Sequence, residues 1–184
     1  KFDFILGAYS STDKYAGLEL IYPALINNPI IVITPLYSSV KISKIDDLKT
    51  LKGGIGTYEH LSDFVSQQVD ALSVQKIEKP YDLYKKLFMK EIDYVLASEY
   101  NARILLAQMG LRSQVALSSS IWSMPLFIGI SKMSRYRDQL RRGLTRLSSE
   151  PQTREKLIKI LQDYILSVEE KNSGVVAPDF IHDK

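Results

Sequence analysis

Residues 53–70, GGIGTYEHLSDFVSQQVD, decide the fold class. The first four residues predict a short strand, and a polar, glycine-rich turn leads from it directly into a helix predicted over 58–70. Residues 92–97, IDYVLA, repeat the unit, because this second strand is followed by a helix over 100–109 that Gly110 closes. Strands that alternate with helices in this way are typical of parallel α/β architecture.

The rest of the chain extends this alternation in both directions. Runs of β-branched and aromatic residues predict strands over 2–6, 30–34, 114–117 and 127–130. Apolar residues at helical spacing predict helices over 45–51, 81–89, 135–147 and 151–168. Ser43 would cap the first of these helices, and Pro80 would open the second. The polar tail from Lys171 is expected to be loosely held.

The composition excludes several classes of protein. With 184 residues, 45% of them hydrophobic, the chain should bury roughly 70% of its unfolded surface. Its apolar runs are far shorter than the ~20 residues of a membrane-spanning helix. The lack of cysteine removes disulfides, thiolate nucleophiles and cysteine-bound zinc. We therefore expect no metal and no cofactor.

The sequence contains no motif for catalysis. It has no HExxH, no P-loop, no GxGxxG and no Ser-His-Asp spacing. The arginines of the helix predicted over 135–147 could form a nucleic-acid patch, but a net charge of +3 is a weak electrostatic footprint and favours a solvated face. We predict a protein that is not an enzyme and has no nucleic-acid partner.

Five segments of the sequence follow the motif order of one known family. Residues 3–15 (DFILGAYSSTDKY) match D-x-I-x-G-G-x-S-x-T-P-E-R in outline, and residues 21–23 (IYP) stand at an F-S-x-P-Y strand. IDDL and LKGGI, within residues 45–55, correspond to I-x-D-L-x-G-K-x-V-G-V. Residues 91–97 (EIDYVLA) and 125–131 (PLFIGIS) correspond to G-x-I-D-A-V-I-x-D and P-L-x-I-A-V-R. Over residues 3–168 the chain thus resembles the bacterial extracellular solute-binding proteins that serve polar amino-acid ABC transporters.

The resemblance implies a type II periplasmic-binding-protein-like α/β fold of two lobes, joined by hinge crossings at residues 34–36 and 124–126. Lobe 1 would comprise residues 1–35 and 125–184, and lobe 2 residues 36–124. The family's first lobe begins with a further strand-helix-strand portion that has no counterpart here, so lobe 1 would be incomplete. Phe2, Phe4, Ile31, Ile33 and the stripe 157–165 would then lack covering neighbours, and we expect a dimer or a missing N-terminal segment to complete the lobe.

On lobe 1, the resemblance places ligand contacts in the turn that follows the first strand. Backbone and hydroxyl groups of this turn would hold the polar end of the ligand. An ordinary Ser/Thr turn is the alternative interpretation. The residues concerned are Tyr9, Ser10, Ser11 and Thr12.

On lobe 2, the resemblance adds Thr57, Tyr58 and Glu59 to the ligand site. They lie at the predicted N-terminus of the helix over 58–70, where free N–H groups and the helix dipole would favour a carboxylate. A helix simply capped by Thr57 is the alternative.

Two positions depart from the family pattern. Tyr15 stands where the family has the arginine that forks onto an α-carboxylate, a geometry that tyrosine cannot supply. Ser98 stands where the family often has the aspartate that takes the ligand's ammonium group, although Glu99, one residue on, could substitute for it. We therefore expect a specificity different from that of the usual amino-acid binders.

The sequence thus predicts a periplasmic protein that captures a small polar solute in the cleft and delivers it to an ABC permease at the membrane. Two alternatives stay open. One is a dehydratase-like enzyme on the same scaffold, for which Glu59, Glu99 or His60 would have to act as acid or base. The other is a sensor or interaction module.

Overall fold

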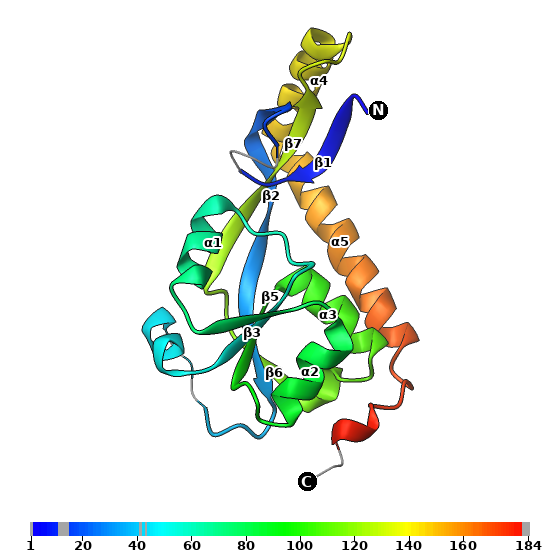
Figure 1. Ribbon diagram of the computed structural model, residues 1–184. Coiled ribbons are helices and arrows are strands. Elements are labelled where there is room, and N and C mark those ends of the chain that lie inside the picture. Colours follow the sequence, from blue (N-terminus) through cyan, green and yellow to red (C-terminus); the bar gives the residue numbers. More distant parts are fainter. Residues whose placement is uncertain (1, 11–14, 41, 43, 182–184) are drawn as a thin grey trace.

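One mixed β-sheet runs through the whole molecule (Figure 1). The computed structural model describes residues 2–10, 15–40, 42 and 44–181. Along the sheet the strand order is β1-β7-β2-β5-β3-β4, and β6 pairs with β2 beside this path. The strands are β1 (Phe4–Ala8), β2 (Leu18–Pro35), β3 (Gly53–Gly56), β4 (Val74–Ile77), β5 (Tyr94–Ser98), β6 (Val115–Leu117) and β7 (Trp122–Ser131).

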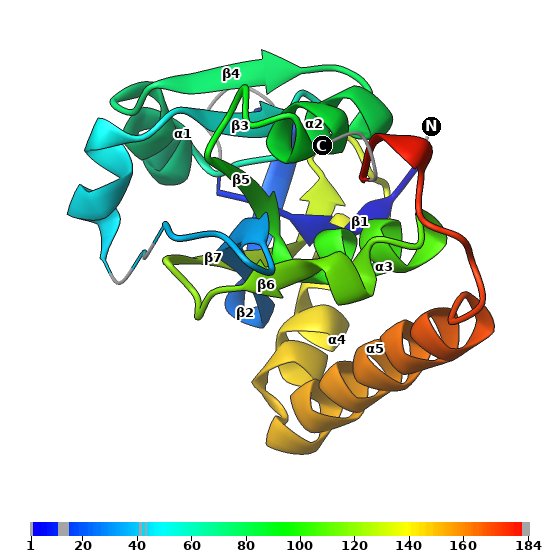
Figure 2. The ribbon, with the colours of Figure 1, turned by 90° about the horizontal axis from the view of Figure 1, so that it is seen from below.

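Helices cover both faces of the sheet, which confirms the predicted α/β class. They are α1 (Asp63–Asp70), α2 (Pro80–Phe88), α3 (Glu99–Gln108), α4 (Arg137–Ser149) and α5 (Pro151–Lys171). Short 3-10 turns span Ile45–Thr50, Arg112–Gln114 and Asp179–Ile181. Figure 2 shows α4 and α5 together on one side of the molecule, away from β3 and β4. The predicted cap Ser43 lies outside the described residues.

β2 is much longer than the strand predicted over 30–34, and it connects the two ends of the sheet. Its first part pairs antiparallel with β7, and residues 30–33 pair antiparallel with β5. The parallel pairs are β3 with β5 and β3 with β4. β4 was not predicted, because four residues without clear alternation carry little strand signal.

The buried part of β2 separates two apolar cores. Ile30 and Val32 face the core that α1 covers, whereas Ile31 and Ile33 face the core under α2 and α3. This division follows from the alternation of side chains along a strand. The expectation that Ile31 and Ile33 would be uncovered was therefore wrong, because pairing with β5 places them inside the sheet, between two helical layers.

The expectation of an uncovered surface is confirmed at the edge strand. β1 pairs antiparallel with β7, and Phe2, Phe4 and Leu6 remain 57%, 44% and 62% exposed. On α5 the predicted stripe is divided, since Tyr164 is exposed but Ile165 is fully buried.

The C-terminal tail is docked, so the expectation of a loosely held tail was wrong for the described residues up to 181. Phe180 is 4% exposed and belongs to the core under α2 and α3. Its ring meets Tyr81 edge-on at 5.1 Å between centroids and lies 5.8 Å from Phe88. In Figure 1 the red segment after α5 accordingly ends beside α2.

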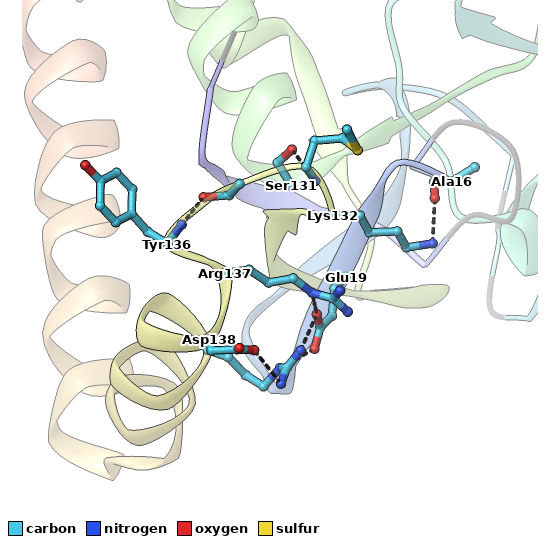
Figure 3. A network of polar contacts seen from close by, with 10 residues as sticks. Ala16, Glu19, Ser131, Lys132, Tyr136, Arg137 and Asp138 are labelled. Carbon is cyan, nitrogen blue, oxygen red and sulfur yellow. Dashed lines mark hydrogen bonds and ion pairs between the residues drawn. The ribbon is translucent and has the colours of Figure 1, made fainter.

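A carboxylate on β2 anchors α4 to the sheet (Figure 3). Glu19 accepts hydrogen bonds from Arg137 Nε at 2.7 Å and from Arg141 Nε at 2.6 Å, and Arg141 also pairs with Asp138. The hydrogen bonds from Arg141 and then Arg137 lower the pKa of Glu19 from 4.5 to about 2. Two of the arginines considered as a nucleic-acid patch are thus engaged by one acidic residue.

The Glu19 network should make stability depend on pH. Because the folded-state pKa is lowered, the stabilisation is present above the ordinary pKa of 4.5 and is lost as the pH falls towards about 2. Since the partners are partly solvated, we expect Glu19→Gln to lower the free energy of unfolding by at most about 1 kcal/mol at pH 6. Urea unfolding at several pH values should show this difference vanish near pH 2, and a difference independent of pH would contradict the assignment. The exposed Glu155, changed to Gln, is the control.

Candidate functional site

The predicted lobe 2 residues meet where two parallel strands end. β3 and β5 are neighbours in register, and Thr57, Tyr58 and Glu59 follow β3 while Ser98 closes β5. Ligands in open α/β sheets bind at the carboxyl ends of such strands. The sequence therefore brings these polar groups to the expected edge of the sheet.

Glu59 is the centre of this arrangement. Its Oε2 accepts hydrogen bonds from Ser98 Oγ at 2.8 Å and from Ser98 N at 3.3 Å, and its Oε1 accepts one from Asn101 Nδ2 at 3.0 Å. Ser98 is 4% exposed and Glu59 is half-buried. The carboxylate is thus held in one position by donors from β5 and α3.

Glu59 occupies the N-terminus of α3. Ser98 is the N-cap residue of this ten-residue helix, and its hydroxyl makes no capping bond to the helix but donates to Glu59. A negative charge at this end of a helix is stabilised by the free N–H groups and the dipole. The anion-binding position of α3 is therefore filled by a side chain of the protein itself.

The helix start predicted at Tyr58 was wrong, so the free N–H groups and dipole of a helix are not available at Thr57 to favour an anion. α1 begins at Asp63, and the Ser62 side chain caps it by accepting a hydrogen bond from Val65 N at 3.4 Å. The backbone at 57–59 is used in turns, since Thr57 N donates to Ile77 O and Glu59 N donates to Gly56 O. Because Thr57 N bonds to β4, the residues after β3 form a turn, and α1 begins only at Asp63.

Tyr9 brings the end of β1 to the same region. It is 8% exposed, and its hydroxyl accepts a hydrogen bond of 2.9 Å from Nδ2 of Asn28, on β2. Burial raises the pKa of Tyr9, and the charge of Glu59 contributes to the same shift. Asn28 is also 8% exposed, and its Oδ1 accepts no hydrogen bond from the described residues.

The other predicted residues lie at different depths. Tyr15 is half-buried and packs against the core that contains Tyr9, whereas Ser10 and Thr57 are exposed. The Tyr58 ring covers Gly56, and burial raises the pKa of Tyr58 to about 12.

Glu99 does not join the Glu59 cluster. It lies in the first turn of α3, where its charge adds to the effect of burial in raising the pKa of Tyr100. Ser11 and Thr12 lie outside the described residues.

Sequence reasoning missed Asn28 and Asn101. Asn28 lies in a part of β2 that was not predicted as a strand, next to Pro29. Asn101 lies in the first turn of α3, three residues after Ser98, and this spacing on a helix start was a usable signal.

Glu59 also borders a hollow of about 220 Å³ between β3 and α1. Its lining includes Thr57, Leu61 and Ser66, together with Lys76 and Asp70, which form an ion pair of 3.2 Å. A larger hollow of about 640 Å³ lies between residues 35–40 and the end of α2, and it includes none of the predicted site residues.

Two further properties bear on the class of protein. Among the residues that the structure describes, no group of His, Asp and Glu is arranged to hold a metal ion. None of the described helices is both long and apolar enough to span a bilayer.

The fold is that of the type II periplasmic binding proteins. The chain is similar to the substrate-binding protein of an amino acid ABC transporter, at 13% identity and a TM-score of 0.60, with 88% of this chain and 71% of the other covered. It is also similar to the ligand-binding core of GluR0 in complex with L-glutamate (12% identity, TM-score 0.61, 94% and 73% covered). A third similar structure is holo ArgBP from T. maritima (16% identity, TM-score 0.58, 89% and 70% covered).

These similarities establish the fold and show how much of each similar protein this chain matches. Each covers nearly all of this chain but only about seven tenths of the other protein, which is consistent with an incomplete lobe. No protein-family profile and no curated protein matches the sequence.

Proposed function

We propose that this protein is a solute-binding protein that captures a small polar solute in a cleft and hands it to an ABC permease. Two hydrogen-bonded pairs support the proposal, Tyr9 with Asn28 and Glu59 with Ser98, and strand pairing brings them close, because Ser98 pairs with Ile30, two residues after Asn28 on β2. They lie at the carboxyl ends of β3 and β5, the edge at which open α/β sheets bind ligands. The similar structures support a binding role, since they include the substrate-binding protein of an amino acid ABC transporter and the ligand-binding core of GluR0. Such a protein works in the periplasm.

The proposed mechanism is closure of two lobes, residues 1–35 with 125–184 and residues 36–124, around the solute. β2 and β7 are the crossings, and their antiparallel pairing at Asn28 with Met124 lies between the two ends of the sheet. The crossing predicted at residues 34–36 lies within lobe 2, because Thr34 pairs with Ala116 of β6. A hinge at residues 27–30 and 122–126 therefore fits the strand pairing better, and it would assign residues 31–35 to lobe 2 in place of lobe 1.

The site residues that we propose combine lobe 1 and lobe 2 groups. They present hydroxyls, aromatic rings and the two carboxylates of Glu59 and Glu99, and Tyr15 stands where the family has an arginine that forks onto a carboxylate. The proposed ligand contacts are Tyr9, Ser10, Ser11, Thr12, Tyr15, Thr57, Tyr58, Glu59, Ser98 and Glu99.

The free edge of β1 is the surface that we propose for completion of lobe 1. Exposed Phe4 and Leu6 lie on β1, and exposed Phe2 precedes it; the outer edge of this strand has no partner strand among the described residues. A second copy or a further segment would cover it. Light scattering of the purified chain distinguishes a dimer or complex from a stable monomer, and the monomer would contradict this part of the proposal.

Solute binding is tested by thermal unfolding and X-ray scattering with a panel of amino acids, sugars, small carboxylates and amines. We expect one class of solute, at about 100 times its Kd, to stabilise the fold by roughly 2.7 kcal/mol and to reduce the radius of gyration. Common α-amino acids should bind roughly two to four powers of ten more weakly than they bind proteins with both charged anchors.

A matched pair of variants locates the binding. Tyr9→Phe, which removes only a hydroxyl of the site, should reduce the shift in unfolding temperature. Tyr37→Ala, at a 91% exposed residue of the larger hollow, should leave it unchanged. A panel in which no solute of any class stabilises the protein would overturn the proposed function.

A further inference from the structure

The charge of the site is one-sided. Glu59 contributes a fixed carboxylate, and none of the ion pairs formed by the described lysine and arginine residues includes it. Lys76, the lysine that borders the same hollow, is paired with Asp70 on α1. A solute in this site therefore meets the negative charge of Glu59, whose described hydrogen-bond donors, on Ser98 and Asn101, are neutral.

The N-terminus of α3 cannot also take a carboxylate from a solute. Glu59 already accepts hydrogen bonds there from Ser98 N and Ser98 Oγ. A second carboxylate would lose these donors and would face a like charge in a half-buried place, where the repulsion is stronger than in water. The geometry thus selects against acidic groups at this point.

The polar atoms of the site that could still form a hydrogen bond with a ligand are mainly acceptors. Oε1 of Glu59 has one described donor, Asn101, although a carboxylate oxygen has room for two. Oδ1 of Asn28, on a side chain that is more than nine-tenths buried, has none. A buried acceptor without a donor costs free energy, so it favours a ligand that supplies an N–H group.

Aromatic rings stand beside these acceptors. The Tyr9 hydroxyl accepts a hydrogen bond from Nδ2 of Asn28, and the Tyr9 ring lies in the core that contains Ile55 of β3, four residues before Glu59. Tyr15 packs against the same core as Tyr9. Tyrosine rings attract cations through their π faces. An ammonium group, with several N–H donors and a positive charge, is the chemistry that suits a carboxylate, an amide oxygen without a donor and aromatic rings alike.

We propose that the solute is a small organic amine without a carboxylate, and that its ammonium group pairs with Glu59. This inference rests on the proposed solute-binding function and narrows its ligand class. The hollow that Glu59 borders has a volume of about 220 Å³, below the range of pockets for drug-sized ligands, which limits the solute to a small molecule.

The test compares each amino acid with the amine that lacks only its carboxylate. Calorimetric titrations with tyramine against L-tyrosine, and with agmatine against L-arginine, isolate the contribution of that group. We expect at least one of the two amines to bind at least tenfold more tightly than its amino acid. Equal or tighter binding of both amino acids would overturn the inference and leave the solute-binding function standing, whereas no binding by any class of solute would overturn both.

Variants of Glu59 test the ion pair itself. Glu59→Gln should weaken binding of the amine roughly 10- to 100-fold, because it removes a charge-assisted hydrogen bond. Glu59→Asp, which keeps the charge, should retain part of the affinity, and Glu170→Gln, at an exposed acid of α5, should retain all of it. Circular dichroism and thermal unfolding establish that each variant is folded. Unchanged amine affinity in folded Glu59→Gln would overturn the proposal.

Discussion

Phe180→Ala is expected to lower the free energy of unfolding by about 3 kcal/mol, because it empties a site that a buried aromatic ring fills between Tyr81 and Phe88. For a domain of this size the loss corresponds to a drop of roughly 6 to 12 °C in Tm. The effect should be large although the residue lies near the end of the described chain, since its ring belongs to the core under α2 and α3.

A second substitution in the same segment serves as the control. Val176 is 86% exposed, so Val176→Ala should change stability by less than about 0.5 kcal/mol. Hydrogen exchange would show faster exchange around Phe180 and α2 in the first variant only. Equal unfolding temperatures for the two variants would show that the tail does not contribute to the core.

Gly53→Ala is expected to destabilise the protein by about 3 kcal/mol. Gly53 pairs with Tyr94 across β3 and β5, and a Cβ at this position would lie 2.5 Å from Cζ of the Tyr94 ring. Tyr94 is fully buried, so its ring has no free space into which it could turn. The added methyl group therefore forces a shift of the sheet or of the ring, as in other overpacked cores.

Two further variants separate this clash from a general effect of replacing glycine. Gly143 is exposed within α4 and has open space at its Cβ position, so Gly143→Ala should stabilise the protein by about 1 kcal/mol. Tyr94→Leu should recover part of the loss in Gly53→Ala, which a double-mutant cycle measures as a coupling energy. Destabilisation of both glycine variants by the same amount would contradict the packing argument.

Much of the candidate site was predictable because its residues follow strands. Glu59 and Ser98 lie directly after β3 and β5, and parallel neighbours end at the same edge. The bond between Glu59 and Ser98 was not predictable, since it depends on where the turn 57–62 directs the side chain. The helix start was misplaced for the same reason, because Thr57 bonds to β4 instead of opening α1.

The exposure of β1 was predicted from the family resemblance. The α/β class, the order of most strands and helices and the lack of cysteine chemistry could be predicted from the amino-acid sequence without any comparison. These features depend on local periodicity and on the alternation of apolar residues, which a single segment carries. The tertiary structure decided the length of β2, the burial of Ile31 and Ile33, the docking of Phe180 and the role of Glu59 at α3. Each of these features depends on a contact between segments far apart in the chain, and a local sequence pattern does not predict such a contact.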